Sequence, residues 1–200
     1  MPFAASRRGA WLPRSLFLLG ALAALAAPPP VLAAGDPRLA DLRVAVVDDS
    51  YLVDFTLVGG FDEEVQEQID AGLPVTFRYR VEILRKRALW DNTLLAQELD
   101  VTVDYDSLTK QYRLSRTVDG ELVDSMVSEK PEEMQRWMTE VRAWKLDPLP
   151  EDKAAEGQRI LRARGRMSPG FVLFFFPYTT GTGWARVPLP PIPPAAPDGD

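Results

Sequence analysis

The sequence of 200 residues contains no cysteine and no histidine. The absence of cysteine excludes disulfide bonds, a thiol nucleophile and a lipid anchor on an N-terminal cysteine, so the core has to be stable without covalent cross-links. The absence of histidine removes the commonest general base near neutral pH, together with Ser-His-Asp catalysis and histidine-bound zinc. Carboxylate, lysine or tyrosine chemistry and oxygen-ligated calcium remain, and so does a protein without catalysis.

An export signal is predicted at the N-terminus. Residues 1–14 carry three arginines, and residues 15–27 are uninterrupted apolar or small residues. That run is shorter than the ~20 apolar residues of a membrane-spanning helix, which is typical of a cleaved signal peptide. We expect residues 1–33 to be removed by cleavage near Ala33, which makes the product periplasmic or secreted. The pair Arg7–Arg8 leaves twin-arginine export open as the alternative to the general secretory route.

The remaining chain is acidic. The 23 basic residues fall to 20 once Arg7, Arg8 and Arg14 are removed, against 29 acidic residues. This balance argues against nucleic acid as a partner, because proteins that bind it present clustered basic residues. Roughly 165 residues remain, a length typical of one domain. We expect this domain to span 39–189, followed by a disordered proline-rich tail over 190–200.

Alternating apolar and polar residues predict a mainly β fold. The longest such run is Val75–Ile83, in which the odd-numbered side chains are apolar. Asp119–Gly120 favours a two-residue hairpin turn. We therefore expect a mainly β (α+β) domain, an antiparallel β-sandwich or curled sheet with two short helices. Further strands are expected over 42–46, 51–57, 99–105, 110–118, 122–127, 158–167, 171–176 and 184–187.

Two short helices are predicted between the strands. Asp62 is expected to cap the first helix, in which Val65 and Ile69 lie one turn apart. The second is expected to begin with Ser128 as its cap and Pro131 in its first turn. One apolar face of each helix should therefore cover a sheet. In the second helix this face consists of Met134, Trp137, Met138 and Val141.

Carboxylates line one face of the strand expected over 99–105. Asp104 and Asp106 share this face with Glu98 and Asp100. Neighbours two apart on a strand lie ~7 Å from each other, a spacing that suits a hydrated cation or the acid and base of a glycoside hydrolase. Asp104 and Asp106 are therefore the catalytic candidates of an alternative function, a carboxylate-dependent hydrolase of envelope glycans.

The competing interpretation of these acids is favoured. Acids that alternate with apolar residues are typical of the solvated face of a half-buried strand, where they pair with arginines across the sheet. The segment around Asp104 also lacks the glycine and the distal glutamate of a calcium loop. The sequence therefore predicts no metal site and no cofactor, and it favours a protein without enzymatic activity, with the hydrolase as the alternative.

Arginines form a second charged set. Arg162, Arg164 and Arg166 share one face of their expected strand, and Arg78 and Arg80 share the polar face of the longest strand. Guanidinium groups bind phosphates, carboxylated glycans and lipid headgroups. These five arginines are the candidates for ligand binding, and pairing with aspartates across the sheet is the competing interpretation.

The most apolar window after the signal is Phe171–Phe176. A loop that presents these side chains, Phe174 and Phe175 among them, could contact a membrane surface or an apolar partner. The competing interpretation is a buried central strand of the same composition. Burial is favoured, because a chain without disulfides needs its aromatic side chains in the core.

One segment carries a family resemblance. Tyr105–Leu114 (YDSLTKQYRL) resembles the segment that marks an uncharacterised family of exported bacterial proteins, domain of unknown function number four-three-nine-zero. Gly72–Phe77, Trp90, Trp137 and Trp184 fall in the matching order. The family has no established activity, so the resemblance assigns no catalytic residue. Because some members are encoded beside sensor kinases, the resemblance implies an accessory role in envelope signalling.

The same segment has a local structural explanation. Tyr105 and Tyr112 can pack on each other across a hairpin while Asp106 accepts hydrogen bonds from the turn backbone. The sequence as a whole favours an exported, non-enzymatic binding or accessory module of the bacterial envelope. Its expected partner is an envelope protein, glycan or lipid, contacted through a sheet face or through Phe171–Phe176 at a membrane surface.

Overall fold

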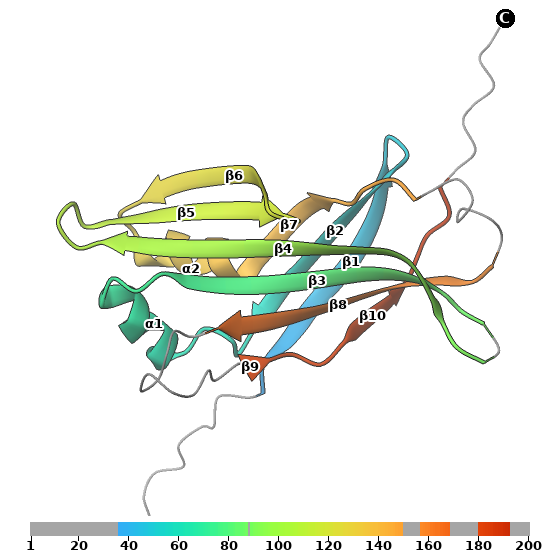
Figure 1. The fold of residues 1–200 in the computed structure, drawn as a ribbon, viewed down its shortest axis with the longest axis horizontal. Helices are drawn as coiled ribbons and strands as arrows, with labels where there is room; N and C mark the ends of the chain where they lie inside the picture. The colour runs from blue at the N-terminus through green and yellow to red at the C-terminus, as the bar shows by residue number, and fades with distance from the viewer. Residues whose placement is uncertain (1–35, 88, 150–156, 169–179, 193–200) are drawn as a thin grey trace, which may run out of the picture. The chain divides into compact units, whose positions relative to one another are not determined.

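Strands make up most of the secondary structure, as the alternating pattern predicts (Figure 1). The structure, a computed structural model, describes residues 36–87, 89–149, 157–168 and 180–192. These residues belong to the compact unit formed by residues 34–200. No helix within the described ranges is long and apolar enough to span a membrane.

The larger sheet has the strand order β10-β8-β3-β4-β5-β6, and β9 pairs with β8. All of its pairings are antiparallel. Strands β3 to β6 follow one another along the chain and in space, whereas β8 returns to the opposite edge of β3. The strands are β3 (Val75–Arg85), β4 (Asn92–Asp106), β5 (Gln111–Val118), β6 (Glu121–Ser128), β8 (Arg159–Ser168), β9 (Thr180–Gly181) and β10 (Ala185–Pro188).

The smaller sheet consists of β1 (Arg38–Val47), β2 (Ser50–Val58) and β7 (Glu140–Lys145), in the order β1-β2-β7. Its strands β1 and β2 run obliquely across β3 and β4 in Figure 1. Because the larger sheet has more strands, the three strands of the smaller sheet cover only part of its inner face. The expected β-sandwich with short helices is confirmed.

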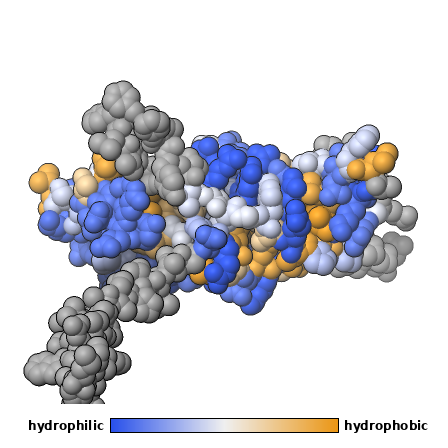
Figure 2. Space-filling model, turned by 90° about the horizontal axis from the view of Figure 1, so that it is seen from below, coloured by the Kyte–Doolittle hydropathy of each residue, from blue (hydrophilic) through white to orange (hydrophobic). Residues whose placement is uncertain are grey.

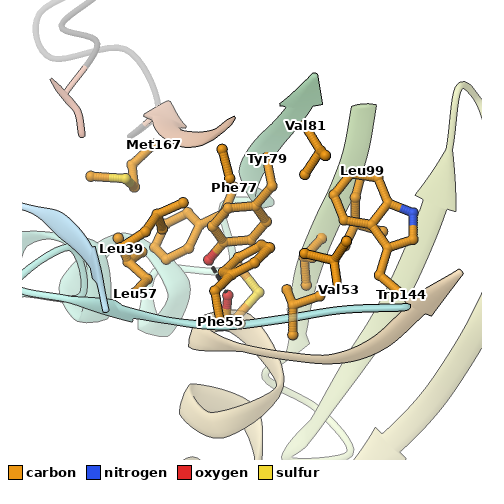
Figure 3. Close-up of a cluster of buried hydrophobic side chains, with 14 of the residues drawn as sticks. Leu39, Val53, Phe55, Leu57, Phe77, Tyr79, Val81, Leu99, Trp144 and Met167 are labelled. Atoms are coloured by element: carbon orange, nitrogen blue, oxygen red, sulfur yellow. Dashed lines mark hydrogen bonds between the residues drawn. The ribbon is translucent and has the colours of Figure 1, made fainter. Parts of the chain in front are cut away.

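The core lies between the two sheets (Figure 3). Phe55 of β2 and Tyr79 of β3 are fully buried, with ring centroids 5.0 Å apart. Val53 and Phe77 are also fully buried. Burial raises the pKa of Tyr79, so its hydroxyl stays protonated and donates a 2.7 Å hydrogen bond to the carbonyl oxygen of Met138. Tyr79 thereby ties the central strand to the second helix.

The first helix begins as predicted. In α1 (Glu63–Asp70), Oδ1 of Asp62 accepts a 3.0 Å hydrogen bond from the amide of Val65. In α2 (Pro131–Thr139), however, the prediction of Ser128 as the cap is wrong, because Lys130 occupies the N-cap position. The Ser128 hydroxyl instead accepts a bond from the amide of Lys130 at 3.1 Å.

The second helix is also shorter than its apolar pattern predicts. It ends at Thr139, and Glu140 has extended backbone angles, so the placement of Val141 in the helix is wrong. Val141 instead lies in β7, where it pairs with Phe55 and is buried. An apolar residue at position 141 is compatible both with the buried face of a longer helix and with the inward face of a strand that follows the helix. Pairing with β2 decides in favour of the strand.

The C-terminal segment stays against the core beyond the expected domain boundary. Leu189 is buried, the hydroxyl of Tyr51 donates a 3.0 Å hydrogen bond to the carbonyl oxygen of Pro190, and Ile192 packs on the core. Residues 193–200 of the expected tail lie outside the described residues. The core therefore includes the first residues of the segment that was expected to be disordered.

Candidate functional site

All five candidate arginines lie on the outer face of the larger sheet. Register places Arg78 opposite Arg166, Arg80 opposite Arg164, and Glu82 opposite Arg162 on the neighbouring strands β3 and β8. Side chains alternate between the two faces of a strand, so these residues point away from the core that their odd-numbered neighbours fill. We call Arg78, Arg80, Arg162, Arg164 and Arg166 the arginine face.

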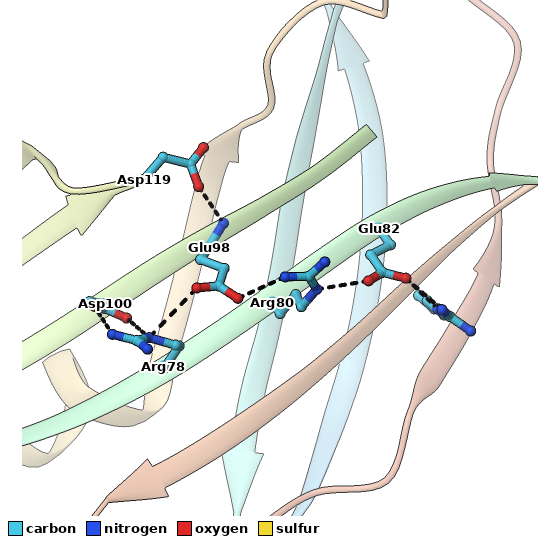
Figure 4. Close-up of polar contacts among 7 residues, drawn as sticks. Arg78, Arg80, Glu82, Glu98, Asp100 and Asp119 are labelled. Carbon is cyan, nitrogen blue, oxygen red and sulfur yellow. Dashed lines mark hydrogen bonds and ion pairs between the residues drawn. The ribbon is translucent and has the colours of Figure 1, made fainter. Parts of the chain in front are cut away.

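The arginines of β3 pair with acidic residues on their other side (Figure 4). Arg78 binds Asp100 of β4 through two hydrogen bonds, from Nε at 2.7 Å and from Nη2 at 2.8 Å. Arg80 bridges Glu82 at 2.7 Å and Glu98 at 2.8 Å. Pairing across the sheet therefore accounts for both arginines of this strand.

Glu82 connects the two strands of the arginine face. Its carboxylate accepts hydrogen bonds from Arg80 of the same strand and from Arg162 of β8, and its side chain is only 8% exposed. Burial alone would raise the pKa of Glu82, but the hydrogen bonds from both arginines outweigh it and hold the pKa below its ordinary value. Glu82 is therefore ionised and holds Arg162 in place.

Arg164 and Arg166 differ from these three arginines. Neither forms an ion pair with any carboxylate of the described residues, and each lies directly across from another arginine. The Arg164 guanidinium stacks on the Trp184 ring at 4.5 Å, and the ring also carries Arg162 at 4.2 Å. Partial burial, followed by the charges of Arg166 and Arg80, lowers the pKa of Arg164. The two side chains therefore form a cationic area without a direct ion pair to a described carboxylate, although the charge of Glu82 acts on Arg164.

This cationic area is shallow. Arg78, Arg80, Arg164 and Arg166 line a hollow with Glu98, and its volume is about 10 Å³. A volume of this size holds about one water molecule. An anion bound there would consequently lie on the surface of the sheet and not in an enclosed pocket.

Asp104 and Asp106 lie at the other end of the same face, where both face Arg113. Its Nη2 atom is 3.6 Å from Asp104 and 3.4 Å from Asp106. Asp106 also accepts hydrogen bonds from the turn amides of Leu108 and Thr109, which lower its pKa. A general acid needs a raised pKa, so these contacts do not favour Asp106 as the acid of a carboxylate pair. The described residues contain no cluster of acidic side chains arranged for a metal ion.

The local explanation of the family segment is confirmed. The rings of Tyr105 and Tyr112 pack with their centroids 4.7 Å apart, and Asp106 holds the turn between them.

Phe171–Phe176, including Phe174 and Phe175, lies outside the described residues. Hydrophilic residues cover much of the surface in Figure 2, and hydrophobic residues show between them in smaller areas.

Sequence reasoning missed three features that bear on binding. It did not find Trp184 as the partner of Arg162, because no local spacing links a tryptophan to a strand about twenty residues earlier. It did not find β7, a six-residue strand directly after a helix. It also passed over Arg116, although a signal exists: Arg116 shares the parity of Leu114 and Val118, so it is a cation on the apolar side of its strand.

Comparison with known proteins gives one match. The sequence model of the family described as Domain of unknown function (DUF4390) matches residues 34–168. No curated protein and no solved structure matches the chain. The matched region contains all five residues of the arginine face, but not Trp184.

Proposed function

Because the chain belongs to the DUF4390 family, whose function is unknown, we propose that it is an exported, non-enzymatic binding module of the bacterial envelope. Its arginine face binds an anionic group of an envelope partner. The N-terminal signal features support export, and the acidic chain without histidine or cysteine supports binding in place of catalysis. An accessory role in envelope signalling agrees with this proposal.

The observation that carries the proposal is that some arginines of the arginine face have carboxylate partners and others have none in the described part of the chain. Glu82, Glu98 and Asp100 are all engaged with other arginines, which leaves Arg164 and Arg166 without a carboxylate among the described residues. Like charges that face each other across a sheet destabilise it. A phosphate or carboxylate group bound to Arg164 and Arg166 would relieve this repulsion, and guanidinium groups bind such anions through paired hydrogen bonds.

Calorimetric titration tests the binding site. The wild-type protein is titrated with inorganic phosphate and with phosphatidylglycerol vesicles, and the variant Arg164→Glu/Arg166→Glu is compared with it. The matched control Arg38→Glu/Arg43→Glu makes the same change of charge at two exposed residues of β1. We expect binding to be lost in the first variant and kept in the control, with both variants folded. Equal losses in the two variants would contradict a specific site.

The export part of the proposal has a separate test. We expect the protein recovered from the periplasm or medium to begin near Ala34, which Edman sequencing or mass spectrometry of the intact protein measures. A full-length protein that remains in the cytoplasm would contradict export, whatever the titration shows.

A further inference from the structure

A groove of about 270 Å³ is lined by residues of β4, β5, β6 and β7. Strands β6 and β7 each stand at the end of the strand order of their sheet, so no pairing closes the sandwich on this side within the described ranges. The volume is close to the lower end of the ~300–1,000 Å³ typical of ligand sites. This groove is separate from the arginine face, which lies on the outer side of the larger sheet.

The edge of β7 borders the groove. Five consecutive residues, Val141 to Lys145, line it. Successive side chains of a regular strand point to opposite faces, but β7 has a bulge opposite Asp54 with a positive φ at Ala143, and this bulge lets consecutive residues line one groove. No strand of the described chain pairs with this edge. A free edge of this kind binds an extended peptide through backbone hydrogen bonds.

Two buried donors at the groove have no acceptor among the described residues. These are the indole Nε1 of Trp144 and the Nε of Arg116, and both residues line the groove. Figure 3 shows the Trp144 nitrogen on the side of the ring that faces away from Val53. Buried N–H groups are almost always hydrogen-bonded in folded proteins. The two unsatisfied donors therefore lie in the wall of the groove, beneath its surface.

Charge in the groove favours an acidic occupant. Arg116 uses its Nη2 atom to bind the carbonyl oxygens of Trp137 at 2.9 Å and Glu140 at 2.8 Å, and it has no ion pair with a carboxylate of the described residues. Burial lowers the pKa of Arg116, and the charge of Asp124, which lies across from it on β6, acts in the opposite direction. Lys145 is exposed and also lacks an ion pair with the described acids. Among the described residues of the lining, Asp124 is the one acid, against the three basic residues Arg116, Arg142 and Lys145.

We propose that this groove binds an extended segment of a partner protein, which adds as a fourth strand to the free edge of β7. Leu99, Val118 and Val141 contact the apolar side chains of the segment that point into the groove. An acidic side chain of the segment lies towards Arg116 and Lys145. The exposed side chain of Val123, at the rim on β6, covers the bound segment.

Selection from random peptides of about eight residues, displayed on phage, tests this inference. We expect enriched sequences to alternate apolar residues, to contain an acidic residue and to lack proline. A synthetic peptide of the enriched sequence is then titrated against Val123→Glu and against the matched control Val127→Glu. Both valines lie on β6 and are 57% exposed, but only Val123 lines the groove. We expect binding to weaken about tenfold or more in the first variant and to stay within about twofold in the control.

Hydrogen exchange places the bound peptide. We expect slower amide exchange in residues 140–145 when the peptide is present. No enrichment, equal binding to both valine variants, or unchanged exchange in β7 would overturn the inference. A dimer in sedimentation that Val123→Glu dissociates, without peptide enrichment, would assign the groove to a second copy of the chain and also overturn it. The Arg164→Glu/Arg166→Glu variant should keep peptide binding, which separates this inference from the proposed function.

Discussion

The arginines of β3 and the last two arginines of β8 are the same residue type on the same face of one sheet, yet their surroundings differ. Arg78 and Arg80 have acidic partners on β4, whereas Arg164 and Arg166 have only arginines across from them on β3. β8 pairs on its other side with β9 and β10, which bring Trp184 but no carboxylate. The difference shows that the position of a strand in the sheet, more than its own charges, separates stabilising arginines from arginines available for binding.

The largest effect on this comparison is expected when Glu82 is changed. Glu82→Gln removes the carboxylate that holds Arg80 and Arg162, so we expect the free energy of unfolding to fall by about 1–2 kcal/mol. Urea unfolding at pH 7 measures it. The control Glu121→Gln, at an exposed position in β6, should stay within about 0.5 kcal/mol of wild type. Equal losses would show that the paired side of the face contributes nothing special to stability.

Low pH should remove the difference in the free energy of unfolding between wild type and Glu82→Gln. The pKa of Glu82 is lowered in the folded protein from its ordinary value of 4.5. A carboxylate of this kind contributes stability above its unfolded pKa and loses it as the pH falls through its folded pKa. We therefore expect the gap between wild type and Glu82→Gln to be complete at about pH 6 and to shrink below about pH 4.5. Urea unfolding across this range checks it, and a gap that does not change with pH would refute the ionic explanation.

The smallest effect is expected in the free energy of unfolding when one paired arginine, Arg78, and one unpaired arginine, Arg166, are each changed to glutamine. Arg78→Gln breaks a two-bond contact with Asp100, but the Arg78 side chain is 52% exposed, so we expect a loss of at most about 1 kcal/mol. Arg166→Gln should change the free energy of unfolding by less than about 0.5 kcal/mol, because no ion pair with a described residue is lost. Chemical unfolding of both variants under identical conditions measures the two values. A larger loss of unfolding free energy in Arg166→Gln than in Arg78→Gln would contradict the distinction between paired and unpaired arginines.

Much of the fold could be predicted because its signals are local. The alternation in Val75–Ile83 and the Asp62 cap each depend on residues close in sequence, and the structure contains both elements. The Asp119–Gly120 turn also lies where it was expected, and both of its residues have positive φ. Strand β7 could not be predicted, because its six residues become a strand only by pairing with β2.

By itself, the sequence determined a mainly β protein without disulfides or histidine chemistry. It also determined that the five arginines point away from the core, because strand periodicity is a property of each segment alone. Only the tertiary structure decided which arginines have acidic partners. Contacts across a sheet depend on strand order and register, and these follow from how the inner faces pack. The same packing left the edge of β7 without a partner strand from the described part of the chain, beside Arg116 and Trp144, which no spacing within the chain reveals.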